Sequence, residues 1–509
     1  MLIKVNMDKN SVISFMPFKK AVYEICDFDK IPEEYIRAIR FLNIFPKDKS
    51  INYSLTSSMN KHSQIRYYTK NRLYRSLKSV VALLQMCDNF LQIEIYNSKY
   101  IDEGTKIFID IINSLKSSNI IIKKIESENP EYGIECYTDD EKRIIEIFEK
   151  KNVEVEDIVF LIDKADEYVN LGDYITAKRI LHFVEKIETN SNVFSILATA
   201  YTMEEDIKNA LNYLKLWYEY GNIYEKAHAC YSLGMLYARH MDRSLENDEI
   251  ARHYLEEGYT LLNKIKKVDS NSLLKDKLFN RNGMALLYFR YGEIDRAIAV
   301  EKEAIASLEK LSDETALLQK SVLMYNLAQC YAQKKEYENS ISVYEDLLKI
   351  DPYFPEYSME QAKNYIELEK YEEAIEYLNR ANKIDSFISE VYSLLGYCYF
   401  CIDNQDAALK NYKLAMSYSD DKYTTLYDYL FILAEYGLYK EAKHILDSYN
   451  ISESVLKENI ELLGSIVSEI YYNNGEKKKA IRLLEQAMSI LPENEEFKSN
   501  YQLLLENDL

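Results

Sequence analysis

The chain has 509 residues, of which 47% are apolar, while its 12 glycines and 7 prolines are too few for a loop-rich or all-β chain. The net charge of −20 is divided unevenly. Residues 1–130 carry 20 basic and 14 acidic side chains, whereas residues 131–509 carry 43 basic and 69 acidic ones. The acidic remainder disfavours a role for this part in binding DNA or RNA.

Two further features of the sequence concern the compartment. No stretch approaches the roughly 18 uninterrupted apolar residues that a membrane span needs. The first 20 residues lack an apolar segment followed by a small-residue cleavage site, and the seven cysteines are scattered and odd in number. We therefore expect a cytoplasmic protein without a disulfide framework.

Residues 1–135 show no internal repeat, and their apolar pattern predicts a small α/β region. The segments FLQIEIY and NIIIKKI are typical of strands, and the apolar helical segment between them predicts one βαβ unit. Residues 136–154 are expected to connect this region to the rest of the chain. In chain order we expect a helix at 32–43, a helix at 64–87, a strand at 90–96, a helix at 102–117, a strand at 119–125 and a helix at 140–150.

The segment IEIYNSKYIDEGTKIFIDIINSL (93–115) resembles the strand, loop and helix around the second acidic motif of signal-transduction NTPases. That resemblance implies a vestigial NTPase fragment, because Asn97 stands where the metal-binding aspartate would end the strand. Gly104 is the sole glycine of residues 1–132, so the glycine loop that cradles phosphate is missing. We expect no nucleotide site and no cofactor. An unrelated small α/β cap is the alternative origin.

A basic segment lies inside this region. No acidic residue occurs between Asp48 and Asp88. Such a segment suits nucleic acid or phospholipid, the acidic remainder of the same chain, or a solvated helix face, and these alternatives stay open. The basic residues concerned are Lys61, Arg66, Lys70, Arg72, Arg75 and Lys78.

From residue 155 onward one pattern recurs with a spacing of 34 residues in its clearest copies. Small residues occupy Ala328, Ala362 and Gly396, and a tyrosine follows each of them three positions later. Two antiparallel helices can approach closely only where side chains are small, and bulky neighbours then fill the layer. The pattern therefore predicts successive helix pairs.

This pattern resembles the tetratricopeptide repeat family, and four stretches of the chain, such as GMLYARH and DPYFPEY, are similar to bacterial proteins of that kind. The resemblance implies a mainly α fold, an α-solenoid of about nine helix pairs over residues 155–492, capped by a helix within 493–509. Departures are Leu430 with Leu433, and Glu301 at an expected apolar position. Extra length is expected near Met241–Asp248, Lys266–Lys277 and Lys310–Leu318. The small-residue position is occupied by Ala165, Ala198, Gly234, Ala285, Ala328, Ala362, Gly396, Leu430 and Ser468, and the tyrosine position by Tyr168, Tyr201, Tyr237, Tyr288, Tyr331, Tyr365, Tyr399, Leu433 and Tyr471.

No residue pattern predicts catalysis or metal binding. Cys398 and Cys401 have the spacing of a half zinc site, but no second such pair exists, and both fall inside a repeat helix where small apolar residues belong. The six histidines show no ligand spacing, and no nucleophile motif occurs. We therefore expect a protein that is not an enzyme and holds neither metal nor cofactor.

The resemblance implies that the first helix of each pair lines a concave groove. Amides can satisfy the backbone of an extended peptide, arginine can hold a carboxylate, and tyrosine offers stacking area. Ordinary solvated side chains are the alternative interpretation. The partner-binding residues expected on this basis are Met235, Arg239, Asn282, Leu286, Arg290, Tyr325, Asn326, Gln329, Gln333, Lys363 and Tyr397.

We therefore expect a non-catalytic scaffold or adaptor that binds a protein or peptide through this groove. Arg239 and Arg290 lead us to expect a partner segment with at least one carboxylate. Only Asn326 fits the clamp by which the family holds chaperone tails, so such a partner is not expected. The alternatives are a peptide-responsive signalling regulator derived from an NTPase–repeat protein, and an enzyme within residues 1–135.

Overall fold

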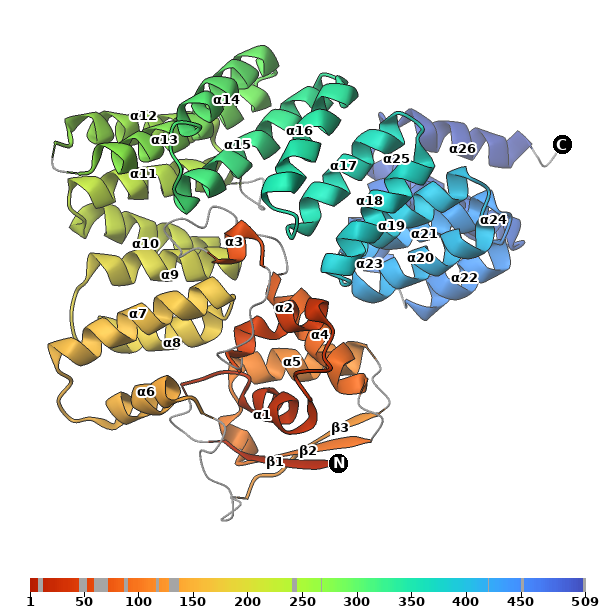
Figure 1. Cartoon of the computed structure of the whole chain (residues 1–509). Helices are drawn as coiled ribbons and strands as arrows, with labels where there is room; N and C mark the ends of the chain where they lie inside the picture. The colour runs from red at the N-terminus through yellow and green to blue at the C-terminus, as the bar shows by residue number, and fades with distance from the viewer. Residues whose placement is uncertain are drawn as a thin grey trace. The chain divides into compact units, whose positions relative to one another are not determined.

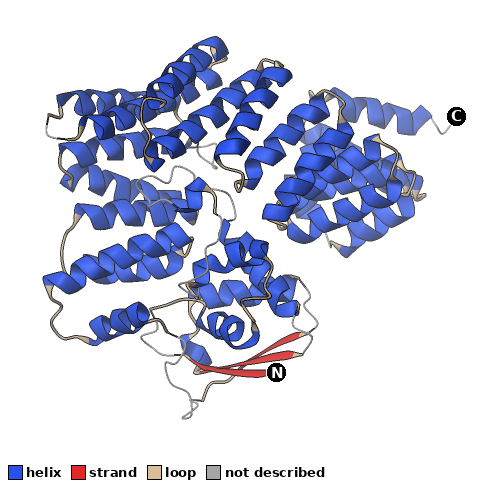
Figure 2. Ribbon diagram, viewed as in Figure 1, coloured by secondary structure: helices blue, strands red, loops and turns tan. Residues whose placement is uncertain are grey.

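The computed structural model describes residues 1–7, 12–44, 53–58, 72–86, 90–115, 119–127, 137–239, 245–266, 268–419, 421–449 and 453–506. It divides into two compact units, each described by itself below. The first comprises Met1–Asn364 with Lys383–Ser386, and the second comprises Tyr365–Asn382 with Phe387–Leu509. The chain is mainly α, and the strands found in these ranges belong to one small sheet near the N-terminus (Figures 1 and 2).

The sheet of the first unit has three parallel strands in the order β1-β2-β3. Leu2 of β1 (Leu2–Asn6) pairs with Gln92 of β2 (Leu91–Tyr96), and Ile120 of β3 (Ile120–Lys124) pairs with Leu91. Alternate burial along β2 follows from the alternation of LQIEIY. Helix α5 (Glu103–Ser114) connects β2 to β3, which confirms the predicted βαβ unit. Strand β1 was not predicted.

The remaining helices of the N-terminal region are short. The expected helix at 32–43 is present as α2 and η1, and the expected helix at 64–87 is described from Arg72 onward, its first residues lying outside the described ranges. Helices α1 and α3 were not predicted. The elements are α1 (Met16–Ile25), α2 (Glu33–Ile39), η1 (Arg40–Leu42), α3 (Leu55–Ser58), α4 (Arg72–Gln85), η2 (Ser98–Tyr100) and α6 (Asp139–Glu149).

The N-terminal region and the first helix pairs share one hydrophobic core. A buried ion pair joins them, with Lys19 Nζ 2.6 Å from Glu141 Oε2, and the Tyr168 hydroxyl donates to Glu141 Oε1 at 3.1 Å. The backbone N–H of Ser14 donates to Thr176 Oγ1 at 3.0 Å. Removing either charge would leave the other buried without compensation, so this pair holds the two parts in one arrangement.

Nine antiparallel helix pairs follow among the described residues, as predicted. In the first unit the pairs succeed one another side by side in chain order (Figure 1). They are α7 (Val155–Leu171) with α8 (Tyr174–Glu185), α9 (Ser191–Met203) with α10 (Ile207–Tyr220), α11 (Ile223–Ala238) with α12 (Asp248–Lys264), α13 (Ser270–Arg290) with α14 (Ile294–Leu308), α15 (Glu314–Gln333) with α16 (Tyr337–Ile350), α17 (Pro355–Glu367) with α18 (Tyr371–Ile384), α19 (Ser389–Cys401) with α20 (Gln405–Tyr418), α21 (Lys422–Glu435) with α22 (Tyr439–Ser448), and α24 (Ile460–Asn473) with α25 (Lys477–Ile490), while α23 (Glu453–Glu458) precedes α24 and α26 (Glu495–Glu506) follows α25.

The small residues mark the close helix crossings. Each lies on the first helix of its pair and is buried. At two crossings a serine bonds across the pair: Ser340 Oγ donates to the Ala328 carbonyl at 2.9 Å, and Ser468 Oγ donates to the Ala480 carbonyl at 3.2 Å. A Cβ added to Gly396 would lie 2.6 Å from the Tyr412 ring, so this crossing has no room for a methyl group.

The irregular spacing in the middle of the array has a structural cause. The first helices of the fourth and fifth pairs are extended, with 21 residues in α13 and 20 in α15. Between the two helices of a pair, the chain turns through a left-handed residue, such as Gly172 with φ of 99° or Lys335 with φ of 61°. In the fourth and fifth pairs the extra residues therefore lengthen the first helix, whereas in the third pair they lie between α11, which ends at Ala238, and α12, which begins at Asp248.

None of the described helices combines the length and the apolar content that crossing a membrane requires.

Replacing Gly396 by Ala should destabilise the second unit by about 1–3 kcal/mol, because the new methyl group overlaps the Tyr412 ring. Amide hydrogen exchange should accelerate in α19, α20 and their neighbours more than in α24 and α25, since each pair packs mainly on adjacent pairs. Lys410→Ala, an exposed change on α20, is the control. Uniform acceleration over the whole chain would contradict nearest-neighbour packing.

Candidate peptide-binding cavity

A cavity of about 380 Å³ opens between helix pairs of the first unit. Its walls come from the C-terminal halves of α13 and α15, from Glu301 of α14, from Arg239 at the end of α11, and from the segment that enters α17. The lining is aromatic and apolar with a few polar groups, as in sites that bind ligands. The lining residues are Arg239, Ala285, Leu286, Phe289, Glu301, Val322, Tyr325, Asn326, Gln329, Cys330, Phe354 and Glu356.

Five of the eleven residues expected to bind a partner line this cavity: Arg239, Leu286, Tyr325, Asn326 and Gln329. They come from three different helices that the repeat spacing places on the same side of successive pairs. The other six residues lie outside the cavity lining, and most of them make contacts within the chain that the sequence pattern did not indicate.

Arg290 is engaged inside the chain. Its guanidinium donates to the Ala238 carbonyl at 2.5 Å and to Glu246 Oε2 at 2.8 Å, and its Nε lies 3.0 Å from Asp248 Oδ1. The side chain thus satisfies the C-terminal end of α11 and ties it to the segment before α12. The expectation that Arg290 holds a carboxylate of the partner is not supported by this arrangement.

Asn282 is buried, although it was expected to face a partner. Asn326 Nδ2 donates to Asn282 Oδ1 at 2.6 Å, which joins α13 to α15. A change at Asn282 would leave the Asn326 amide without this partner, so we expect Asn282 to contribute to the packing of α13 on α15. Asn326 is half-buried and remains at the cavity wall.

Glu360 organises the polar rim on α17. Its carboxylate accepts a hydrogen bond from Gln329 Nε2 at 3.0 Å and one from Lys363 Nζ at 2.8 Å. Gln329 Nε2 also donates to the Tyr344 hydroxyl at 2.7 Å. Gln329 therefore lines the cavity in a fixed orientation, while Lys363 supports it from outside.

The last three expected residues are more distant from the cavity lining. Met235 is half-buried on α11, and Gln333 is exposed near the end of α15. Tyr397 belongs to the second unit, where it is 40% exposed and contacts the Tyr371 ring at a centroid distance of 6.4 Å.

Sequence reasoning noticed Glu301 as a departure from the repeat but did not place it in the site. Its side chain is 1% exposed, and one carboxyl oxygen, Oε2, has no hydrogen-bond partner. Burial raises the pKa of Glu301 well above its usual value, and a hydrogen bond from Asn326 and the charge of Arg239 offset this only in part. The sequence did contain a signal for this site, because Glu301 places a carboxyl group at a repeat position that is otherwise apolar.

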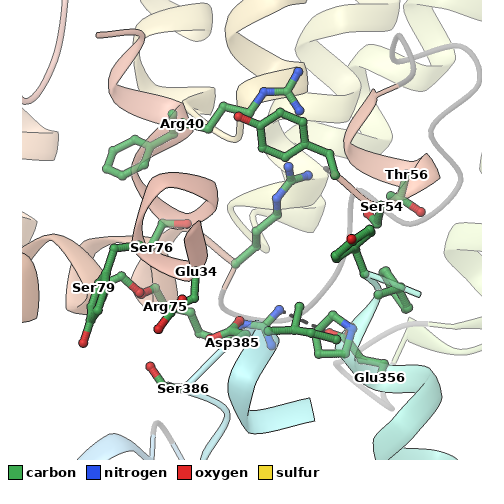
Figure 3. A pocket seen from close by; sticks show the side chains of 18 of the residues that line it. Glu34, Arg40, Ser54, Thr56, Arg75, Ser76, Ser79, Glu356, Asp385 and Ser386 are labelled. Carbon is green, nitrogen blue, oxygen red and sulfur yellow. Dashed lines mark hydrogen bonds and ion pairs between the residues drawn. The ribbon is translucent and has the colours of Figure 1, made fainter. Parts of the chain in front are cut away.

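Next to the cavity, the N-terminal region contacts the helix pairs of the same unit. Arg75 of α4 lies between two carboxylates, with Nη2 3.2 Å from Glu356 Oε1 and Nε 3.3 Å from Asp385 Oδ2 (Figure 3). The backbone N–H of Leu55 in α3 donates to Asp351 Oδ2 at 3.1 Å. For its described part, the basic segment therefore docks on the acidic repeats of its own chain. Lys61, Arg66 and Lys70 lie outside the described residues.

These contacts surround a second, smaller pocket of about 130 Å³ (Figure 3). Arg40, Arg72 and Arg75 line it together. Burial lowers the pKa of Arg72 to about 10, and the neighbouring charges of Arg40 and Arg75 act in the same direction. Phe354 and Glu356 line both the small pocket and the larger cavity, so the two spaces share a wall.

Within the described ranges, no three His, Cys, Asp or Glu side chains come together in a way that could hold a metal ion. Cys398 is a free, buried cysteine, and burial raises the pKa of its thiol to about 12. Such a thiol packs as a small apolar group.

The pKa of Glu301 predicts a pH-dependent stability. Above pH 4.5, its usual pKa, the unfolded chain releases the proton that the folded chain keeps. The stabilisation is therefore complete below this pH and is lost as pH rises toward the folded pKa, at about 1.4 kcal/mol per pH unit. Glu301→Gln has no such proton, so its denaturation midpoint relative to wild type should rise as the pH increases above 4.5. A constant difference, as expected for the exposed Glu303→Gln control, would show that Glu301 is ionised in the folded chain.

The model of the tetratricopeptide repeat family matches residues 322–354 and 356–387, which cover most of α15 to α18. No curated protein sequence matches the chain. Among solved structures it is similar to a tetratricopeptide repeat protein from Parabacteroides merdae, with 15% identity and a TM-score of 0.36 over 56% of this chain and 100% of that one.

Similarity extends to MamA, with 21% identity and a TM-score of 0.29 over 33% of this chain and 90% of that one. It extends also to YrrB, described as a TPR protein with an unusual peptide-binding site, with 16% identity and a TM-score of 0.29 over 36% and 92% of the two chains. The family match shows that residues 322–354 and 356–387 are tetratricopeptide repeats, and the helix pairs around them carry the same small-residue and tyrosine positions.

Proposed function

We propose that this protein is a non-catalytic scaffold that binds a peptide segment of a partner protein in the cavity lined by α13 and α15. The observation that carries the proposal is the composition of that cavity. It combines the aromatic residues Phe289, Tyr325 and Phe354 with the amides of Asn326 and Gln329. Its volume of about 380 Å³ is enough for one or two side chains of a bound segment.

The amides suit an extended or short helical peptide. The N–H groups of both amides donate within the chain, and their oxygens can accept from the backbone N–H groups of a bound segment, which need partners when they leave water. Tyr325 is half-buried and contacts the Tyr344 and Tyr357 rings at 6.1 and 5.9 Å, so its ring is held rigid before a ligand arrives. A preformed aromatic wall costs little entropy on binding.

In this proposal the chain is organised as expected from the sequence, with an α/β region at 1–135, a connector at 136–154, repeats at 155–492 and a cap at 493–509. The alternative of an enzyme within residues 1–135 gains no support. The side chain of Asn97, at the end of β2, donates to Asn6 Oδ1 at 3.2 Å. That amide holds β1 and β2 together at their C-terminal ends.

A second candidate function, a peptide-responsive regulator, is favoured by one observation. The segment Phe354–Glu356 lines the cavity on one side and receives Arg75 of the N-terminal region on the other. A peptide that displaces Glu356 would weaken the contact of α4 with the repeats. Binding and release of the N-terminal region would then be coupled, and coupling between two sites is reciprocal.

For the cavity, we predict that Tyr325→Ala and Leu286→Ala each weaken peptide binding by about 10-fold or more, since a hot-spot contact is worth above 1 kcal/mol. Full-length protein would first select ligands from a display library of random peptides, and fluorescence anisotropy would then give the affinities of the selected sequences. The exposed Glu303→Ala on α14 is the matched control. Selected peptides that bind all three variants as tightly as wild type would place the site elsewhere.

For the coupling, Arg75→Ala should release α3 and α4 from the repeats, because it removes the cation between Glu356 and Asp385. Amide hydrogen exchange in residues 72–85 should accelerate, and selected peptides should bind more tightly, with a gain of up to roughly 1–3 kcal/mol. Lys106→Ala, an exposed change on α5, should alter neither quantity. Faster exchange with unchanged peptide affinity would remove the regulatory candidate and leave the scaffold.

A further inference from the structure

Glu301 occupies a core position of the repeat, 16 residues after the small residue of its first helix. Seven other pairs have an apolar or aromatic side chain at that position, all of them buried. A carboxyl group there costs stability that leucine would not cost. The seven residues are Leu181, Leu214, Tyr344, Leu378, Tyr412, Leu446 and Leu484.

The structure does not satisfy this carboxyl group internally. Oε2 is shielded from solvent and has no hydrogen-bond partner, although the residue lines the cavity. The amide of Asn326 reaches the group but is shared with Asn282 Oδ1. A buried polar group without a partner, on a residue that lines a cavity, indicates a ligand that completes it.

Three properties of the surroundings define that ligand. Phe289, Tyr325 and Phe354 provide aromatic walls, which attract cations. Two carboxyl groups, those of Glu301 and Glu356, line the cavity, and Arg239 is the one cation among its lining residues. Residues 131–509 have 69 acidic and 43 basic side chains, so the long-range field draws a cationic segment toward the repeats.

We propose that the cavity accepts a lysine or arginine side chain of the partner, whose ammonium or guanidinium group pairs with the Glu301 carboxylate. This inference rests on the proposed peptide-binding function and names its specificity. It replaces the earlier expectation of a carboxylate on the partner, for which Arg290 is no longer available.

The pairing involves a proton. Burial raises the pKa of Glu301 well above its usual value, so the free protein keeps this proton at pH values between the usual pKa and the raised one. A cationic side chain pairs with the ionised form, so one proton leaves Glu301 for solvent when the peptide binds. Affinity should therefore rise with pH up to the pKa of the free protein. A ligand that presents an acceptor to the protonated carboxyl group would give the opposite slope.

The test uses peptides selected by the full-length protein, blocked at both ends and free of histidine. Each lysine in turn is replaced by norleucine, which keeps the stem and removes the charge. At one position the replacement should weaken binding to wild type by at least about 10-fold. Binding to Glu301→Gln should be equally weak with lysine or norleucine at that position. Glu303→Gln, on the exposed side of α14, should behave as wild type.

Calorimetry in two buffers of different ionisation enthalpy should detect proton release on binding to wild type and none on binding to Glu301→Gln. Glu301→Leu is a second variant that should fold, because leucine occupies this position in most other helix pairs. It too should bind the peptide without releasing a proton. The inference would be overturned if the lysine replacement and Glu301→Gln changed the binding free energy independently of each other. Proton uptake on binding would overturn it too, as would selected peptides that contain no basic residue. Failure to select any peptide sensitive to Leu286→Ala would overturn the proposed function itself.

Discussion

The close approach of the two helices in each pair is the constraint on which the rest of this structure depends. At each crossing a buried small residue, such as Ala328 or Gly396, removes the side chain that would keep the helices apart. Where serine stands at a crossing, its hydroxyl finds a carbonyl of the facing helix, as Ser340 does. Because the crossings fix the rotation of every first helix, residues four positions apart on α13 and α15 face the same side, and the cavity is formed there.

Glu301 is the residue of this repeat position that lowers the folding stability of the array. The repeat accommodates leucine at this position without any polar requirement, and a buried carboxyl group adds a desolvation cost and a dependence on pH. The neighbouring amides do not remove this cost, since Asn326 is divided between Glu301 and Asn282. Natural chains retain such local conflicts mainly at functional sites, where a ligand or a conformational change supplies the missing partner.

The sequence alone was sufficient to predict the structural elements that depend on a periodic spacing of residues. The helix pairs and the βαβ unit follow from short-range pattern, and the resemblance to the repeat family indicated the cavity residues Leu286, Tyr325 and Asn326. Strand β1 was missed because Leu2–Asn6 is short and its partner strand lies some ninety residues away. The role of Arg290 was misjudged for a related reason, as its partners Glu246 and Asp248 belong to an insertion that the repeat pattern does not describe. Long-range pairing leaves no local trace in a single sequence.

Docking on the acidic remainder of the chain was one of the alternatives that the charge division left open, and the structure shows it for Arg75, next to the cavity. In the proposed complex, a cation in the cavity would attract the same Glu356 carboxylate that contacts Arg75, because Glu356 is a lining residue of both spaces. A lysine entering the cavity therefore competes with Arg75 for negative charge and gains Glu301 as a second partner. The free energy of that competition is sufficient to couple ligand binding in the cavity to the docking of α4 on the repeats. A ligand without a positive charge would fill the same volume and leave α4 in place.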